Sequence, residues 1–270
     1  DVVILGAGMT GLCAAFYLSR SLGKDAVRVL EAGDRVGGTS WTEHADGFTC
    51  ETGPNGFLDK EPKTLQWAAD LGITDALVRA DSSSARRFIY CNGQLHEIKP
   101  PPAFLASPLL SAKGRARLLC QPLIPQKRDE TPETVWDFAA RRIGREAADT
   151  LVSSMVSGVF GGDAKVLSLT HCFPKMASME RQYGSLFKAL IAKKKENKNA
   201  SAMGPAGTLT STKHGIGFLP RSAADALGDR VRTNSPAVSM RQEKDRYVVM
   251  TGDGSETEAR AVIIAIPAYA

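Results

Sequence analysis

The sequence VVILGAGMTGLCAAFYL at residues 2–18 decides the fold. A short apolar run rich in β-branched residues leads into Gly6, Gly8 and Gly11, which have the spacing G-x-G-x-x-G, and apolar residues then recur at helical spacing. In a strand–turn–helix unit of this kind, the first glycine permits a tight turn and the second lets a pyrophosphate approach the backbone. The third glycine allows close packing of helix on strand, and the helix N-terminus offers free N–H groups to the phosphate. The stretch therefore predicts a dinucleotide-binding α/β fold.

A second strand follows this helix and ends in an acidic residue. The sequence VRVLE at residues 27–31 completes a βαβ unit and places Glu31 twenty residues after the last motif glycine. At this position a carboxylate can accept both hydrogen bonds of a ribose diol, and it repels a 2′-phosphate, which disfavours NADP. Arg35 and the pair Gly37-Gly38 then supply a fixed cation and bare backbone N–H groups beside a pyrophosphate. This pattern resembles the extended FAD fingerprint of the flavin-containing amine oxidase superfamily, so we expect FAD as the cofactor.

Composition limits the other functions that the chain can have. Its 270 residues carry 34 Lys and Arg against 29 Asp and Glu, a net charge of +5, and 43% are hydrophobic, enough for a buried core. No apolar run reaches the ~18–20 residues that cross a bilayer, so we expect no integral membrane helix. The basic residues are dispersed apart from the lysines at 193–195 and 198, and we expect no nucleic-acid partner. The five cysteines and four histidines lack ligand spacing, so we expect reduced thiols and no metal site.

The order of predicted elements indicates a sheet domain interrupted by helices. The fold class that we expect is α/β: a Rossmann-like FAD-binding domain (residues 1–79 and 199–270) with an inserted, mainly helical region (80–198). Within the insertion, helical patterns cover residues 111–120, 132–142, 144–157, 174–183 and 185–195. After a polar linker at 196–207, we expect a helix at 219–227 and strands at 229–233, 237–241, 245–251, 256–260 and 261–266. The last segment thus returns to the sheet that the first segment begins.

Further segments resemble the protoporphyrinogen oxidase family of this superfamily over nearly the whole chain. Each segment is modest alone, and their order and spacing together are specific. The segments are ETGPNGFLD (51–59), RRFIY (86–90), PPAFL (101–105), SGVFGGD (157–163), LSL (167–169), FPKM (173–176), ME (179–180), GSL (184–186) and AIPA (265–268).

The resemblance implies an activity. Members of that family oxidise protoporphyrinogen IX to protoporphyrin IX in haem biosynthesis with FAD and O2, and a hydride leaves a bridging methylene carbon for the flavin N5. The flavin carries this chemistry, so we expect no catalytic side chain. Two alternatives stay open: another FAD enzyme of the superfamily, such as an amine oxidase or a carotenoid desaturase, and a non-catalytic FAD-binding fragment.

The resemblance also implies binding residues. Arg87 matches the arginine that binds a substrate propionate, with Arg86 as the alternative, because a guanidinium suits a carboxylate through two parallel hydrogen bonds. Gly158 and Gly161 match a glycine-rich helix end that lies against the macrocycle; a helix-ending glycine before a turn is the alternative interpretation. The further FAD contacts that we expect are Met9, Thr10, Ala32, Gly53, Pro54, Asn55, Val238, Ala265 and Pro267.

The inserted region corresponds to the part of that family that binds membranes. Two apolar pairs lie beside three basic residues and would place apolar side chains in the bilayer interface and cations at the headgroups; packing inside the core explains the apolar pairs equally well. These residues are Phe104-Leu105, Leu109-Leu110, Lys113, Arg115 and Arg117. We expect a peripheral membrane protein, on the cytoplasmic side in a bacterium or on an organellar inner membrane, and the resemblance allows a homodimer.

Two features depart from the family. Where the family has a glycine pair before a helix, this sequence has His214-Gly215-Ile216-Gly217, so the conformation of that loop stays open. Chains of the family are longer, and their later residues complete the substrate pocket and contribute a second FAD-contacting stretch. We therefore expect the 270 residues to be the first part of a larger flavoenzyme, holding FAD incompletely and inactive alone.

Overall fold

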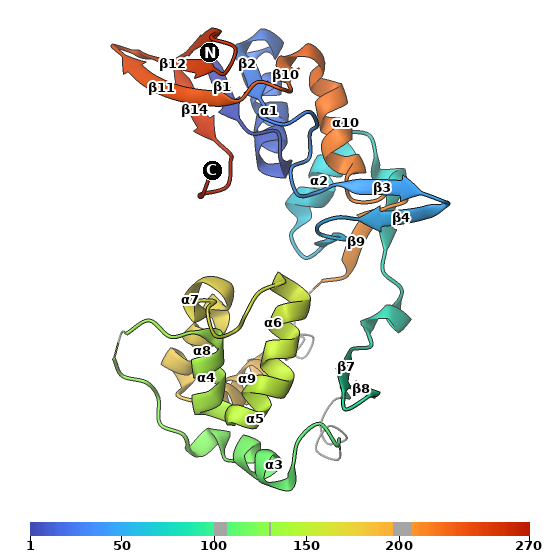
Figure 1. Cartoon of the computed structure of the whole chain (residues 1–270), viewed down its shortest axis with the longest axis vertical. Coiled ribbons are helices and arrows are strands. Elements are labelled where there is room, and N and C mark those ends of the chain that lie inside the picture. The colour runs from blue at the N-terminus through green and yellow to red at the C-terminus, as the bar shows by residue number, and fades with distance from the viewer. Residues whose placement is uncertain (100–106, 130, 197–206) are drawn as a thin grey trace. The chain divides into compact units, whose positions relative to one another are not determined.

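The computed structural model describes residues 1–99, 107–129, 131–196 and 207–270 (Figure 1). The chain divides into two units, Asp1–Ala80 with Pro205–Ala270, and Asp81–Gly204, and each has its own buried clusters. The first unit therefore combines two stretches that are far apart in sequence. Phe104, Leu105, Lys198 and residues 197–206 of the predicted linker lie outside the described residues.

The helices and strands of both units have the following bounds. The α-helices of the first unit are α1 (Met9–Leu22), α2 (Pro62–Asp70) and α10 (Phe218–Leu227). Its strands are β1 (Val2–Leu5), β2 (Val27–Leu30), β3 (Thr42–Ala45), β4 (Phe48–Glu51), β5 (Phe57–Leu58), β6 (Leu77–Arg79), β9 (Leu209–Thr212), β10 (Val231–Arg232), β11 (Ala237–Glu243), β12 (Arg246–Thr251), β13 (Glu256–Ala259) and β14 (Ala261–Ile264). The second unit contains β7 (Phe88–Cys91), β8 (Gln94–Glu97), α3 (Ala112–Leu119), α4 (Val135–Ile143), α5 (Arg145–Ala147), the π-helix η6 (Ala148–Val152), α6 (Ser153–Phe160), α7 (Leu169–Cys172), α8 (Pro174–Tyr183) and α9 (Leu186–Glu196). Short 3-10 helices are η1 (Lys24–Ala26), η2 (Thr74–Ala76), η3 (Ser82–Ala85), η5 (Gln121–Leu123) and η7 (Gly228–Arg230).

A four-stranded parallel sheet in the order β10-β2-β1-β14 forms the centre of the first unit. All residues of β1 are buried, which is typical of a central strand in a parallel sheet. Because the four strands run in the same direction, their carboxyl ends meet along one edge, where open α/β sheets bind their ligands. The expected α/β class is confirmed, and the returning strand of the last segment lies next to the first strand of the chain.

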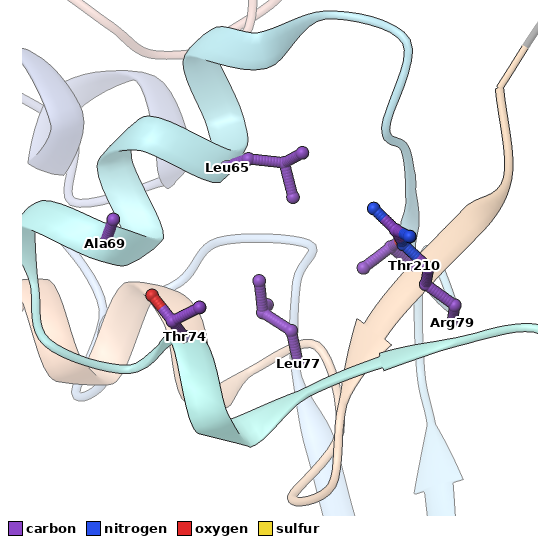
Figure 2. A pocket seen from close by; sticks show the side chains of 6 residues that line it. All are labelled: Leu65, Ala69, Thr74, Leu77, Arg79 and Thr210. Carbon is purple, nitrogen blue, oxygen red and sulfur yellow. The ribbon is translucent and has the colours of Figure 1, made fainter.

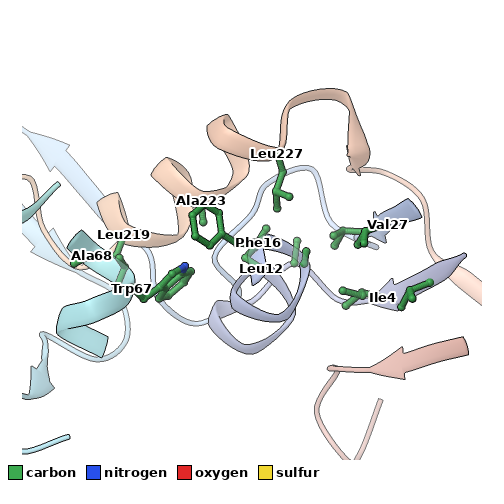
Figure 3. Close-up of a cluster of buried hydrophobic side chains, with 13 residues drawn as sticks. Ile4, Leu12, Phe16, Val27, Trp67, Ala68, Leu219, Ala223 and Leu227 are labelled. Atoms are coloured by element: carbon green, nitrogen blue, oxygen red, sulfur yellow. The ribbon is translucent and has the colours of Figure 1, made fainter. Parts of the chain in front are cut away.

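Both faces of this sheet are covered. On one face, Ile4 joins Leu12 of α1 and Leu227 of α10 in a buried cluster (Figure 3). On the other face, Val3 packs with Val249 of the antiparallel sheet formed by β11, β12 and β13. Successive side chains of β1 therefore point into different layers, as the alternation of a strand requires.

A smaller sheet in the first unit differs from the sequence-based expectation, which contains none of its three strands. β9 pairs antiparallel with β5 on one side and β6 on the other. Its sequence LTST has no apolar residue beyond the first, yet Thr210 and Thr212 are buried. A cavity of about 320 Å³ lies beside this sheet (Figure 2) and is lined by Leu65, Ala69, Thr74, Leu77, Arg79 and Thr210. None of these lining residues belongs to the predicted FAD or substrate contacts.

The second unit is mainly helical, with two differences from the predicted helices. The helix predicted at 144–157 is part of a longer helical run from Arg145 to Phe160, which passes through the π-helix η6. The run includes Gly158 and is capped at its C-terminus by Gly161, whose left-handed φ of 60° favours glycine. The short helix α7 has no predicted counterpart, because its four residues are too few for a periodic pattern.

A buried ion-pair network connects helices of the second unit. The side chain of Arg142 is fully buried, donates to three main-chain carbonyl oxygens and lies 3.2 Å from Glu180. Arg141 donates to Glu133 at 2.9 Å and to Glu180 at 2.8 Å. Burial raises the pKa of the Glu180 carboxyl, but the two arginines outweigh that effect, so the pKa lies below its usual value. The network therefore stabilises this unit in its ionised form.

One part of the membrane hypothesis is wrong. Leu109 and Leu110 are only 6% and 2% exposed, so they cannot enter a bilayer interface, and the alternative of packing in the core holds for this pair. The guanidinium of Arg117 donates to the main-chain carbonyl oxygens of Arg141 and Arg142. Among the residues that the structure describes, no helix combines the length and the apolarity that a bilayer crossing requires.

Candidate functional site

The predicted cofactor residues gather where the carboxyl ends of the parallel strands meet. Glu31 follows β2 directly; its carboxylate accepts one hydrogen bond from the N–H of Ala7 (2.7 Å) and one from the N–H of Gly33 (2.8 Å). Its carbonyl oxygen accepts from the N–H of Ser235, after β10, at 2.8 Å. Glu31 thus connects the loops that follow β1, β2 and β10. A carboxylate has about four acceptor sites, so capacity for ribose hydroxyls is left over.

The three glycines of the motif have different surroundings. Gly6 has a φ of 100°, and a Cβ there would lie 2.8 Å from the carbonyl oxygen of Ala265, just after β14. A Cβ on Gly11 would lie 2.0 Å from the carbonyl oxygen of Gly6. A Cβ on Gly8 would meet no atom of the described residues within 4 Å. The fold itself therefore needs Gly6 and Gly11, whereas the bare backbone at Gly8 faces space that a ligand can enter.

The first turn of α1 is available to an anion. Gly8 is the N-cap, and no side chain of the described residues caps the helix. As in any α-helix, the N–H groups of the first turn, here those of Met9 and Thr10, have no intrahelical partner. Thr10 is exposed and Met9 half-buried. Together with the helix dipole, such N–H groups favour negative charge at this end.

The glycine pair Gly37-Gly38 lies directly against this turn. Gly37 donates its N–H to the carbonyl oxygen of Ala7 at 2.8 Å, and its φ of 101° favours glycine. The guanidinium of Arg35 donates to the carbonyl oxygen of Gly38 at 2.9 Å and stacks on the ring of Trp41, with 4.5 Å from Cζ to the ring centroid. These contacts hold a cation beside the glycine loops.

The loop predicted to lie beside the flavin ring also reaches this edge. Gly53, Pro54 and Asn55 are exposed, and a Cβ on Gly53 would lie 1.9 Å from the carbonyl oxygen of Thr39. The N–H of Thr52 donates to the carbonyl oxygen of Trp41 at 3.0 Å. The structure thus brings the loop at 53–55 into close contact with the chain that follows Gly37-Gly38.

The remaining predicted FAD contacts lie on the last part of the chain. Ala265 donates its N–H to the carbonyl oxygen of Leu5 at 2.8 Å, and Pro267 follows in an exposed turn. Val238 is 58% exposed and lies at a register shift at the start of β11, which leaves its backbone outside the ladder pairs. Ala32 lies in the exposed loop after β2.

These residues fit a dinucleotide. A bare glycine backbone, an uncapped helix N-terminus and a fixed arginine suit a pyrophosphate, and a carboxylate at the end of β2 suits a ribose diol. Contacts of individual residues with FAD stay predictions. The described residues contain no group of three or more His, Cys, Asp and Glu that could hold a metal ion.

The predicted substrate residues lie in the second unit. The guanidinium of Arg86 forms two hydrogen bonds with Glu97, at 2.7 and 3.1 Å. Arg87 is exposed and donates to the carbonyl oxygens of Ser84 and Arg86, and within the described part of the chain it has no carboxylate within 4 Å. Of the two arginines, Arg87 is therefore the one whose charge is not already matched by a carboxylate.

The two predicted substrate glycines differ in their backbone. Gly158 lies within α6 and is exposed, and Gly161 caps the C-terminus of that helix. The cap explains a glycine at Gly161 without a ligand, whereas Gly158 has an ordinary helical place that does not require one. Two exposed apolar side chains follow Gly158: Val159 is 68% and Phe160 45% exposed.

Sequence reasoning missed the contacts that hold the open loop at 214–217. Thr42 and Glu51 bind this loop through buried and half-buried side-chain atoms. Two features of the sequence could have indicated these contacts: the glycines at 215 and 217, and the carboxylate of Glu51 at the start of the segment ETG.

A parallel α/β sheet with a glycine turn, a free helix N-terminus and an acidic residue after the second strand defines a dinucleotide-binding protein. The signature of the family described as flavin containing amine oxidoreductase matches residues 9–270, and the chain belongs to that family.

Individual relatives narrow the similarity further. The chloroplastic protoporphyrinogen oxidase 1 of Arabidopsis thaliana is 31% identical over all of this chain and 53% of its own length, and the human protoporphyrinogen oxidase is 31% identical over 99% of this chain and 60% of its own. The coproporphyrinogen III oxidase of Bacillus subtilis is 30% identical over 79% of this chain and 46% of its own. The chain thus spans about half the length of the curated relatives it matches.

Solved structures agree with this fold. A crystal structure from Exiguobacterium, assigned as a protoporphyrinogen oxidase, superposes with a TM-score of 0.77 at 27% identity, over 98% of this chain and 59% of that one. A putrescine oxidase superposes with a TM-score of 0.66 at 22% identity, covering 99% of this chain and 58% of its own, and shows the likeness of fold alone.

Proposed function

We propose that this chain belongs to an FAD-dependent enzyme that oxidises protoporphyrinogen IX to protoporphyrin IX, with O2 as the electron acceptor. The observation that carries the proposal is the 31% identity to plant and human protoporphyrinogen oxidases over 99% or more of the chain. The geometry of the glycine loops supports FAD as the cofactor, and the unmatched charge of Arg87 supports a carboxylated substrate.

The chain's own residues would bind and orient the reactants. When bound, FAD supplies the electron acceptor for a hydride from a bridging methylene carbon of the porphyrinogen. The first turn of α1 and Arg35 would neutralise the pyrophosphate, and Glu31 would accept hydrogen bonds from the ribose. Arg87 would fix a propionate through two parallel hydrogen bonds. The protein would therefore contribute the positions of the cofactor and the substrate and the exclusion of water from the reacting atoms.

A second substrate is favoured by one specific observation. Coproporphyrinogen III oxidases are also among the relatives, at 30% identity in Bacillus subtilis and 26% in Staphylococcus aureus. Coproporphyrinogen III undergoes the same oxidation and carries more propionates, so it demands more cationic partners in the pocket.

A fluorescence assay tests both substrates. The gene product that carries this chain is incubated with FAD and either porphyrinogen, and the rise of porphyrin fluorescence is followed. A faster rise with protoporphyrinogen IX than with coproporphyrinogen III supports the proposal, and the reverse order supports the second substrate. No rise above autoxidation with either one refutes a porphyrinogen oxidase; turnover of an amine would then indicate an amine oxidase.

Peripheral association with a membrane is a separate proposal. In the segment beside Lys113, Leu119 and Leu123 are 55% and 81% exposed, and they could enter an interface that Leu109 and Leu110 cannot. Flotation with anionic vesicles tests this proposal. Protein that stays in the dense bottom fraction, instead of rising with the lipid, would refute the association.

A further inference from the structure

A polar clamp connects the β3–β4 hairpin to the loop that precedes α10. The clamp consists of Thr42, Glu51, Ile216 and Gly217. The hydroxyl of Thr42 donates to Glu51 Oε2 at 2.7 Å and accepts from the N–H of Gly217 at 2.9 Å. Glu51 Oε1 accepts from the N–H of Ile216 at 2.8 Å. Two side chains from the first segment of the chain thus satisfy two successive backbone donors from the last segment.

The clamp lies in a closely packed and buried place. Thr42 is 2% and Ile216 2% exposed, and Gly217 is buried. A Cβ on Gly215, which has a φ of 80°, would lie 2.2 Å from Thr42 Cγ2 and 2.7 Å from Glu51 Oε1. A Cβ on Gly217 would lie 2.9 Å from the backbone nitrogen of Thr42. The two glycines therefore let the loop approach the hairpin closely enough for its N–H groups to reach the clamp, and a buried N–H that loses its acceptor is costly.

Each end of the clamp leads directly into the candidate cofactor site. Glu51 is two residues before Gly53, whose Cβ position touches the carbonyl oxygen of Thr39. On the other side, α10 begins right after Gly217, and its Pro220 lies 3.3 Å from the position of a Cβ on Gly37. The clamp therefore fixes the loops at 37–41 and 52–55 against α10.

We propose that Thr42 and Glu51 are positioning residues of the FAD site. They hold the loop at 53–55 and the second glycine pair in the geometry for binding before the cofactor arrives, which lowers the ordering cost of binding. The inference rests on the proposed use of FAD. It assigns these residues a role through the loops that they hold, without contact to the cofactor.

Matched variants separate positioning from general stability. Thr42→Val keeps the shape and removes the hydroxyl, and Thr42→Ser restores the hydroxyl. Glu51→Gln leaves a single acceptor oxygen for two donors, the Thr42 hydroxyl and the Ile216 N–H. Thr251→Val is the control: Thr251 is also buried (5% exposed) in the same unit, and its hydroxyl donates to Asp253 at 2.7 Å in the β12–β13 turn. We expect Thr42→Val to weaken FAD binding about ten-fold and to change the visible absorption of bound flavin. Thr42→Ser and Thr251→Val should behave like the wild type in both.

Hydrogen exchange of the FAD-free protein supplies a readout that does not depend on the cofactor. Loss of the hydroxyl should accelerate exchange of the Gly217 amide and increase exchange in the loop at 52–56, and Thr42→Ser should restore protection. Equal exchange and equal FAD affinity in Thr42→Val and Thr42→Ser would overturn the inference. If Thr42→Val does not fold, Glu51→Gln carries the same comparison, with faster exchange expected at the amides of Ile216 or Gly217, whose bonds depend on the two Glu51 oxygens directly or through Thr42.

The outcomes keep the two proposals apart. A wild-type gene product that carries this chain and binds no FAD refutes the cofactor assignment and, with it, the positioning role. A wild-type chain that binds FAD, with variants that bind equally well, refutes the positioning role alone. An equal loss of FAD affinity in Thr251→Val would also refute it, since the effect would then follow stability.

Discussion

Gly8→Ala is the substitution that best separates the needs of the ligand from the needs of the fold. The φ and ψ of Gly8 are −76° and −179°, a conformation that alanine adopts freely, and the added Cβ would meet no described atom within 4 Å. Gly11→Ala is the opposite case, because its Cβ would lie 2.0 Å from the carbonyl oxygen of Gly6. The same chemical change thus enters open space in one variant and backbone in the other.

The magnitudes follow from these surroundings. For Gly8→Ala, the reduced entropy of the unfolded chain stabilises by about 0.4–1 kcal/mol, and the loss of a favoured N-cap residue costs about as much. The stability of the FAD-free protein should therefore stay within about 1 kcal/mol of the wild type. A methyl group over the first turn of α1 would keep a pyrophosphate from its N–H donors; two charge-assisted hydrogen bonds of about 1.5 kcal/mol or more each correspond to about 100-fold weaker binding.

Thermal unfolding and FAD titration measure the two effects independently. We expect Gly8→Ala to melt like the wild type and to lose FAD affinity, whereas Gly11→Ala should lose at least about 2 kcal/mol of stability even without FAD. Wild-type affinity for FAD in Gly8→Ala would show that no pyrophosphate lies over this glycine. A large loss of stability in Gly8→Ala would show that the space beside it is not open.

Three further predictions concern the second unit. Arg87→Ala should raise the KM for the porphyrinogen about ten-fold with FAD content unchanged. Arg86→Ala should leave KM unchanged and weaken the β7–β8 hairpin, because it removes the bonds to Glu97. Steady-state kinetics and melting curves distinguish the two variants. Because the pKa of Glu180 is lower in the folded chain, its stabilisation is present at neutral pH and is lost as the pH falls through the folded pKa. Glu180→Gln should therefore cost about 3 kcal/mol at neutral pH and flatten the acid side of a series of melting curves. Gly158→Ala should raise stability by about 0.5–1 kcal/mol, since its Cβ meets no described atom within 4 Å, and should raise KM; an unchanged KM would remove Gly158 from the substrate surface.

The features that the sequence predicts well have their causes close together in the chain. The strand, turn and helix at 2–22 depend on glycines and apolar residues within a few positions of one another, so the periodic pattern suffices. The same holds for α8, which is predicted at 174–183 and begins with Pro174 and ends before Gly184.

The missed features depend on partners far away in sequence. β9 is a strand because β5 and β6, more than 120 residues earlier in the chain, pair with its two edges, and its own sequence LTST has no amphipathic pattern. Leu109 and Leu110 illustrate a different limit: an apolar pair beside basic residues fits a membrane interface and a protein core equally well until burial is known. The clamp could not be predicted from the sequence because its partners are distant in the chain: Thr42 and Gly217 are 175 residues apart.

The candidate FAD site shows why this distinction matters for function. Every glycine of the fingerprint lies in the first 38 residues, yet the turn at Gly6 fits against the carbonyl oxygen of Ala265, and β1 pairs with β14 along its whole length. The helical face of the sheet is likewise completed by α10, whose Leu227 shares a buried cluster with Ile4. A local motif therefore specifies which ligand can bind, whereas the returning segment, held to the first by the clamp and the sheet, supplies the rigidity that a preorganised site requires. The geometry of the proposed FAD site is thus encoded in both segments of the first unit.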